Sequence, residues 1–172
     1  MLPTYKEAKQ QNKNPKWSLD KVIINGKTSA IVKDKVKDIN INTTEKAVAL
    51  QHDIHHTPPE HLQGSSFQGH RVHITNQDEI VPALHALYSD ARIARATHNI
   101  YAYRLKTPSG HLEHYEDDGE WGAGSKLLDL LKANHIEDTL VCVTRWYGGT
   151  HLGKARFDFI LNCAKKSLQI DT

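Results

Sequence analysis

The sequence lacks any long apolar run, and this absence limits the kinds of protein it can be. No window of its 172 residues approaches the roughly 18 consecutive apolar residues that a membrane-spanning helix needs. Its start, MLPTYKEAKQQNKN, also lacks the apolar core of a secretory signal peptide. Membrane-spanning and secreted proteins are therefore disfavoured, and we expect a cytoplasmic protein.

The sequence has few cysteines and no large excess of charge of either sign. The two cysteines, Cys142 and Cys163, each lie inside an apolar pattern rather than in a closely spaced motif. This arrangement does not suit a disulfide framework, so we expect two reduced and buried thiols. The formal net charge is only +2, which permits nucleic-acid binding without arguing for it.

Apolar residues concentrate after Phe67, so the N-terminal part of the chain is weakly patterned. Residues 1–16 are polar and predict a flexible arm. Apolar stretches flank the dipeptide at positions 25–26, Asn-Gly, which is typical of hairpin turns. A weak helical pattern covers 44–50, and the paired prolines of HDIHHTPPEH (52–61) predict an irregular linker.

The remaining residues carry strong periodic patterns and predict one folded domain. We therefore divide the chain into an N-terminal extension, residues 1–63, and a domain, residues 64–172. The predicted class is α+β, a two-layer sheet-and-helix sandwich. In order, the predicted elements are a strand over Phe67–Ile74, a helix from about Asp78 to Tyr88, a hairpin of Thr97–Leu105 and His111–Glu116, a helix over Gly124–Asn134, a central strand over Leu140–Val143 and a closing helix with Phe157 to Leu168 on its apolar face.

Three segments contain residues that packing explains poorly: ATHNIYAYR (96–104), EDDGEWGAG (116–124) and TRWYGGTHLG (144–153). Each lies at a predicted strand end or at a loop that opens a helix, so we expect the three to converge. They supply a candidate partner-binding surface, in which the planar cation of Arg145, the rings of Trp146 and Tyr147 and two flexible glycines would stack on or clamp a partner. Its candidate residues are His98, Arg104, Asp117, Asp118, Glu120, Arg145, Gly148 and Gly149.

Each candidate also has a structural interpretation. The acidic residues precede a glycine-rich helix start, where carboxylates stabilise the positive helix end, although they could also form a magnesium site or an acid/base pair. Arg145 could form an internal ion pair with Asp117 or Asp118 instead of meeting a partner. Trp146 and Tyr147 could simply end a central strand as core residues.

Chemical motifs that would make the chain an enzyme are weak. The run GEWGAGSK resembles a phosphate-binding loop, but Ser125 precedes Lys126, whereas the motif needs the opposite order. The histidines of the 52–61 segment match no closed zinc pattern, and no serine or cysteine lies in a nucleophile signature. We therefore predict no catalytic residues, no metal and no cofactor.

The same segments carry a family resemblance. Together with GSSFQGH (64–70) and RFDFILNCAKKSL (156–168), they resemble the IMPACT family and its bacterial relative YigZ, with ATHNIYAYR and RWYGG favouring the eukaryotic branch. The resemblance implies a fold similar to domain IV of elongation factor G. It also implies a non-enzymatic repressor in the stress response, which restrains the kinase that phosphorylates translation initiation factor 2 by competing for its ribosome-associated activator. Actin is a further partner that the resemblance implies.

The sequence departs from the family pattern in three places. Leu62-Gln63 replace an aspartate-arginine pair, and residues 1–63 are too short for the N-terminal RWD domain through which longer relatives contact the kinase activator. The C-terminal ferredoxin-like domain of bacterial relatives is not expected either. Two further hypotheses stay open: a ribosome- or RNA-binding module, and a hydrolase that uses the acidic loop.

Overall fold

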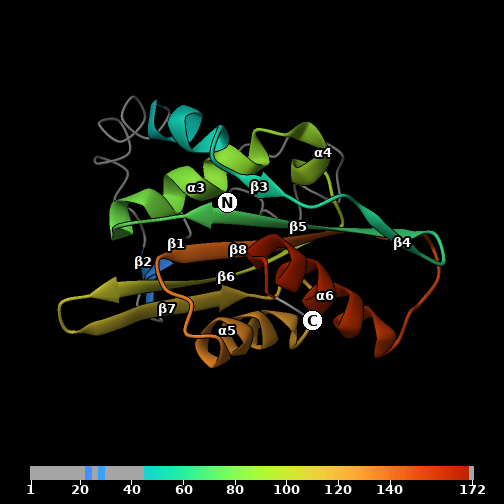
Figure 1. The fold of residues 1–172 in the computed structure, drawn as a ribbon. Helices are drawn as coiled ribbons and strands as arrows, with labels where there is room; N and C mark the ends of the chain where they lie inside the picture. Colours follow the sequence, from blue (N-terminus) through green and yellow to red (C-terminus); the bar gives the residue numbers. More distant parts are fainter. Residues whose placement is uncertain (1–21, 25–26, 30–44, 171–172) are drawn as a thin grey trace.

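The computed structural model describes residues 22–24, 27–29 and 45–170 (Figure 1). None of the helices in this part of the chain is both long and apolar enough to cross a membrane. Residues 45–51 are helical, as the weak pattern there predicted. The other elements are β1 (Val22–Ile24), β2 (Lys27–Ser29), β3 (His55–His56), β4 (Glu60–Leu62), β5 (Ser65–His73), the 3-10 turn η2 (Gln77–Glu79), α3 (Ile80–Tyr88), α4 (Ala91–Ala94), β6 (His98–Thr107), β7 (Gly110–Glu116), α5 (Ala123–Ala133), β8 (Thr139–Trp146) and α6 (Ala155–Leu168).

The main sheet is antiparallel and has the strand order β3-β5-β8-β6-β7, with β4 also paired to β5. Strand β8 is the central strand, and Cys142 on it lies opposite His70 of β5 and Tyr101 of β6. Seven of its eight residues are buried. The continuous apolar run therefore predicted a central strand correctly, because only a strand covered on both faces can bury successive side chains.

Burial of β8 on both faces requires helices on both faces (Figure 1). Leu140 and Cys142 belong to a core cluster with the residues of α3, and Val141 and Val143 belong to a second cluster with those of α5 and α6. The predicted α+β class is confirmed. The predicted two-layer arrangement is wrong, because the sheet lies between two helical layers.

The linker predicted over residues 52–61 is also wrong in part. Strands β3 and β4 both pair with β5, and Thr57 between them donates its amide to the Gly69 carbonyl at 2.9 Å. The two prolines, Pro58 and Pro59, fall between the two short strands, where a missing N–H costs no ladder bond. The division of the chain at residue 64 stays a prediction.

The predicted hairpin near residue 25 is present as strands, because β1 and β2 pair antiparallel with Ile24 opposite Lys27. The turn dipeptide itself and the arm over residues 1–16 lie outside the described residues.

Helix α3 begins later than the predicted start at Asp78. The Asn76 side chain accepts a hydrogen bond from the Asp78 amide at 2.9 Å and caps the 3-10 turn that leads into α3 at Ile80. Pro82 then lies in the first turn of α3, where its missing N–H removes no helical hydrogen bond. The short helix α4 was not predicted, because four residues are too few to show a period.

Candidate functional site

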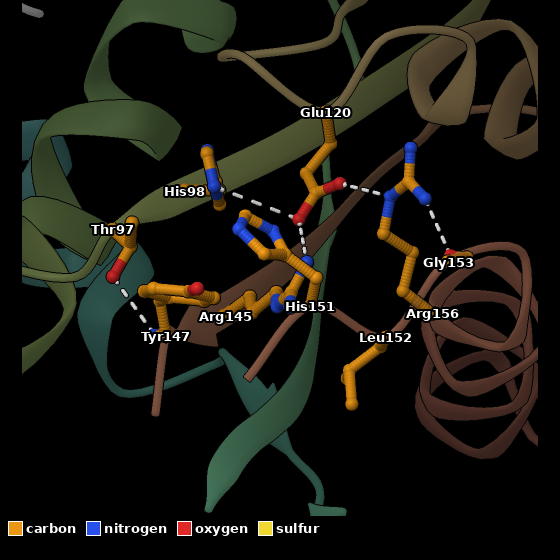
Figure 2. A pocket seen from close by; sticks show the side chains of 9 residues that line it. All are labelled: Thr97, His98, Glu120, Arg145, Tyr147, His151, Leu152, Gly153 and Arg156. Atoms are coloured by element: carbon orange, nitrogen blue, oxygen red, sulfur yellow. Dashed lines mark hydrogen bonds and ion pairs between the residues drawn. The ribbon is translucent and has the colours of Figure 1, made fainter. Parts of the chain in front are cut away.

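An open pocket of about 440 Å³ lies where β6, β8, the loop after β7 and the start of α6 meet (Figure 2). Its walls come from the three segments that the sequence singled out, together with the first turn of α6. The predicted convergence is therefore confirmed. The lining residues are Thr97, His98, Glu120, Arg145, Tyr147, His151, Leu152, Gly153 and Arg156.

The carboxylate of Glu120 is the electrostatic centre of this pocket, although only 3% of the residue is exposed. Its Oε1 accepts a hydrogen bond from Arg145 Nη1, and its Oε2 accepts one from Arg156 Nε at 2.8 Å (Figure 2). The Nε2 atom of His98 lies 3.6 Å from Oε1. Two guanidinium groups thus compensate one buried carboxylate, as a buried charge requires.

Arg145 is held from both sides. It projects from β8 opposite His98 of β6 and Phe67 of β5, and its guanidinium lies 5.4 Å from the Phe67 ring centre and 5.6 Å from that of Tyr147. The internal ion pair considered for Arg145 is present, but its partner is Glu120 rather than Asp117 or Asp118. The buried Nε of Arg145 has no hydrogen-bond partner within the described residues.

The two aspartates organise the loop rather than line the pocket. Asp117 accepts from the Gly124 amide at 2.7 Å and the Gly122 amide at 3.1 Å, and so caps the start of α5. Asp118 accepts from the Asn99 amide at 2.7 Å, and its carbonyl accepts from His98 Nδ1 at 2.7 Å. The helix-start interpretation therefore holds for Asp117, and Asp118 ties the loop to β6.

Arg104 does not belong to the site. It shares a strand face with His98, as the alternation predicted, but it lies six residues further along β6, about 20 Å at the usual rise of a strand. There it donates from Nε to Glu113 at 2.9 Å and from Nη1 to the Ile136 carbonyl at 3.3 Å. Its placement in the candidate surface was wrong, because alternation specifies the face of a strand and not the end.

The two glycines support the loop that follows β8. A Cβ atom on Gly148 would overlap the Gly64 backbone and lie 2.5 Å from the Ser65 nitrogen, so this position requires the close approach that only glycine allows. Gly149 has a φ of +90° and open space around it. Neither lines the pocket, and Gly148 contributes through packing.

The sequence interpretation missed Arg156 and His151 as site residues, and it considered Tyr147 as a ring that would clamp a partner without including it among the candidate residues. Arg156 lies in the first turn of α6, 36 positions from Glu120, and a lone arginine at a helix start has no local signal of a partner that distant. Tyr147 is 40% exposed and contacts His151 with ring centres 5.8 Å apart, so it is not the core residue considered for it. Trp121, next to Glu120, is 78% exposed.

A series of hydrogen-bonded polar side chains runs across the sheet to the site. The Thr144 hydroxyl donates to Asn99 Oδ1 at 2.8 Å, and it therefore accepts a hydrogen bond from His70 Nε2, also at 2.8 Å. The other ring nitrogen of His70, Nδ1, then accepts from His56 Nδ1 at 2.8 Å. The backbone amide of Asn99 also donates to the Asp118 carboxylate, so this series of hydrogen bonds connects edge strand β3 to the loop that carries Glu120. Burial, and next the charge of His56, lower the pKa of His70 to about 3.

We expect the free energy of unfolding to fall as the pH drops below about 6.5. The unfolded chain binds a proton at His70 there, whereas the folded chain does not until about pH 3. This one group should contribute a loss of about 1.4 kcal/mol per pH unit within that window. Urea unfolding between pH 7 and pH 5 measures how the free energy of unfolding changes with pH. In His70→Gln this slope should be smaller by about 1.4 kcal/mol per pH unit, the contribution of one proton. Replacing exposed His52 with Gln is the control, and an unchanged slope in His70→Gln would contradict the expectation.

The arrangement suits recognition better than catalysis. Both carboxylate oxygens of Glu120 are engaged by arginines, and both of Asp117 are engaged by backbone amides. Over residues 22–24, 27–29 and 45–170, no group of three or more His, Cys, Asp or Glu side chains is positioned to hold a metal ion. Cys163 is buried, and its pKa is raised to about 12, which makes it a poor nucleophile.

A family model and several curated proteins match this chain. The family model of the Impact N-terminal domain matches residues 63–168. The chain is 37% identical to Protein IMPACT of Bos taurus over 139 residues and 38% identical to that of Homo sapiens over 138, in each case over 78% of this chain and 44% and 43% of the relative. Protein IMPACT homolog of Schizosaccharomyces pombe is 39% identical over 105 residues, or 60% of this chain and 38% of that one. The chain thus spans less than half the length of these curated relatives.

Two solved structures are similar as well. The two-domain translational regulator Yih1 is 29% identical over 68% of this chain and 46% of its own, with a TM-score of 0.49. A crystal structure described as that of a hypothetical protein is 21% identical over 67% of this chain and 57% of its own, with a TM-score of 0.56. The second likeness shows that the fold is shared.

Proposed function

The chain belongs to the IMPACT family, and we therefore propose that it regulates translation by binding a protein partner rather than by catalysing a reaction. The match of residues 63–168 to the family model carries this proposal. The role in translation follows from the family resemblance, and Yih1 is itself described as a translational regulator.

The chemistry of the pocket supports binding. Its floor is a carboxylate that two arginines already neutralise, so Glu120 is not available as a base, and no serine or cysteine lies among the lining residues. Tyr147 in the pocket lining and Trp121, the residue after Glu120, expose aromatic surface to solvent. Trp, Tyr and Arg are the residues that most often contribute the binding energy of protein interfaces. The hydrolase hypothesis has no comparable support.

The finer proposal concerns the partner. The family resemblance supports a cytoplasmic repressor in the stress response, which restrains the kinase that phosphorylates translation initiation factor 2 by competing for its ribosome-associated activator. Actin is a second protein partner on the same ground. An RNA- or ribosome-binding module, with a fold like domain IV of elongation factor G, is the alternative that the exposed Trp121 and Tyr147 favour, because bases stack on aromatic rings.

A pull-down from cell extract with the whole chain tests the proposal. We expect the kinase activator to be retained, and Trp121→Ala to reduce retention by more than about tenfold, because an exposed tryptophan is a typical anchor. Val48→Ala is the matched control. Val48 is 53% exposed and belongs to the helix over residues 45–51, which lies on the same side of the sheet as α3 and on the other side from α5 and α6.

The other outcomes decide between the alternatives. Retention of ribosomes that is lost after ribonuclease treatment would favour the RNA-binding alternative, and retention of actin alone would favour actin. Equal retention by Trp121→Ala and the unchanged chain would contradict the placement of the binding surface.

A further inference from the structure

The pocket keeps an excess of positive charge. Two guanidinium groups, those of Arg145 and Arg156, face the single carboxylate of Glu120, which leaves a net charge of +1 while the histidines are neutral. The lining also includes the imidazole rings of His98 and His151. A pocket with this balance attracts a monoanion.

Both arginines have hydrogen-bonding capacity that the fold does not use. The Nε of Arg145 is buried without a partner, and within the described residues the hydrogen bonds of Arg156 involve Nε and Nη1. Arg145 itself is only 4% exposed, so its guanidinium has little access to bulk water. The Arg156 side chain is 27% exposed, so its remaining N–H groups are the ones that an entering acceptor can reach.

The two guanidinium groups are also fixed before any ligand arrives. Arg145 lies between the Phe67 and Tyr147 rings, and Arg156 lies 4.4 Å from the Phe157 ring centre and donates to the Gly153 carbonyl. Little side-chain freedom remains to be lost on binding. The planar fork of an arginine matches a carboxylate or a phosphate.

We infer that this pocket binds the carboxylate of an acidic side chain in a partner protein, an inference that rests on the proposed function. A phosphomonoester carries up to two negative charges and would meet the Glu120 carboxylate at the pocket floor. The loop beside the pocket adds Glu116, Asp117 and Asp118, which would repel a nucleic-acid backbone more than a single acidic side chain. Exposed Trp121 supplies apolar surface for a neighbouring residue of the partner.

Nuclear magnetic resonance titration of the whole chain with two matched probes tests this inference. The probes are N-acetylglutamic acid α-amide and N-acetylglutamine α-amide, which differ in one charge. We expect the first to give saturable shifts at the Arg156 Nε–H and at the Tyr147 and Gly153 amides, and the second to give none. Arg156→Gln should lower the affinity for the acidic probe at least tenfold, because the pocket loses its excess positive charge. Glu120 keeps Arg145 as its partner in this variant.

Lys154→Gln is the matched control, since it removes one charge from an exposed residue two positions away that does not line the pocket. It should change the affinity by less than twofold. If Arg156→Gln fails to fold, Arg156→Lys retains the charge without the fork and should also weaken the probe. Equal shifts with both probes, or none with either, would overturn the inference, and so would an oligouridylate that binds the pocket more than tenfold tighter than the acidic probe.

The inference and the proposed function can fail separately. Retention of the translation partner by Arg156→Gln at the level of the unchanged chain would sink the pocket as the docking point and leave the proposed function standing. Saturable binding of the acidic probe without any translation partner in the pull-down would support the pocket as a binding site and contradict the proposed function.

Discussion

Replacing Glu120 with Gln should lower the free energy of unfolding by about 3 to 5 kcal/mol, the loss expected when one partner of a buried ion pair is removed. The substitution keeps the shape of the side chain and leaves Arg145, which is 4% exposed, without its counter-charge. Arg156 is more exposed and can turn toward water, so most of the cost arises at Arg145. Urea unfolding followed by circular dichroism measures the loss.

The control for this substitution is Asp129→Asn, which makes the same chemical change at an exposed position of α5. It should alter stability by no more than about 0.5 kcal/mol. A double variant with Glu120→Gln and Arg145→Gln should lose less than the sum of the two single variants, because neither buried charge then remains uncompensated. A loss below about 1 kcal/mol in Glu120→Gln would show that solvent reaches the pair, and would contradict its assignment as a buried network.

Replacing Gly69 with Ala should lower the free energy of unfolding by about 3 kcal/mol, the upper end of the usual cost of overpacking. Gly69 lies on β5 beneath α6, and a Cβ atom there would overlap the Cys163 carbonyl oxygen and lie 2.8 Å from its carbon. These are backbone atoms, so no side-chain rotation relieves the clash. Helix α6 must move away from the sheet, and Arg156 at its start would move with it.

Gly149→Ala serves as the comparison, because Gly149 has a φ of +90° but no atoms within 4 Å of an added Cβ. It should cost about 1 kcal/mol from backbone strain alone. Thermal and urea unfolding of the two variants separate the effects. Equal losses in both would mean that α6 accommodates the methyl group, and that the close contact between α6 and β5 is not needed for stability.

The sequence by itself determined the larger elements of the domain and the general place of the site. Local patterns reflect which side chains are buried, and for that reason the helix after residue 122 was predicted close to its observed bounds, and the middle of the central strand was predicted although β8 continues to Trp146. The convergence of the three segments was also predictable, because strand ends and helix-opening loops gather at the edges of a sheet. Family membership followed from the same segments.

Only the tertiary structure decided which charges meet. Positive φ values at Asp118 and Gly119 direct the chain so that Glu120, rather than either aspartate, enters the pocket, and no periodic pattern encodes such a turn. The choice of Arg156 over Arg104 likewise depends on which end of β6 faces the start of α6. The partners of Glu120 lie 25 and 36 positions away in the sequence, so their contact arises from strand register and helix packing across the whole domain, which local sequence patterns do not specify.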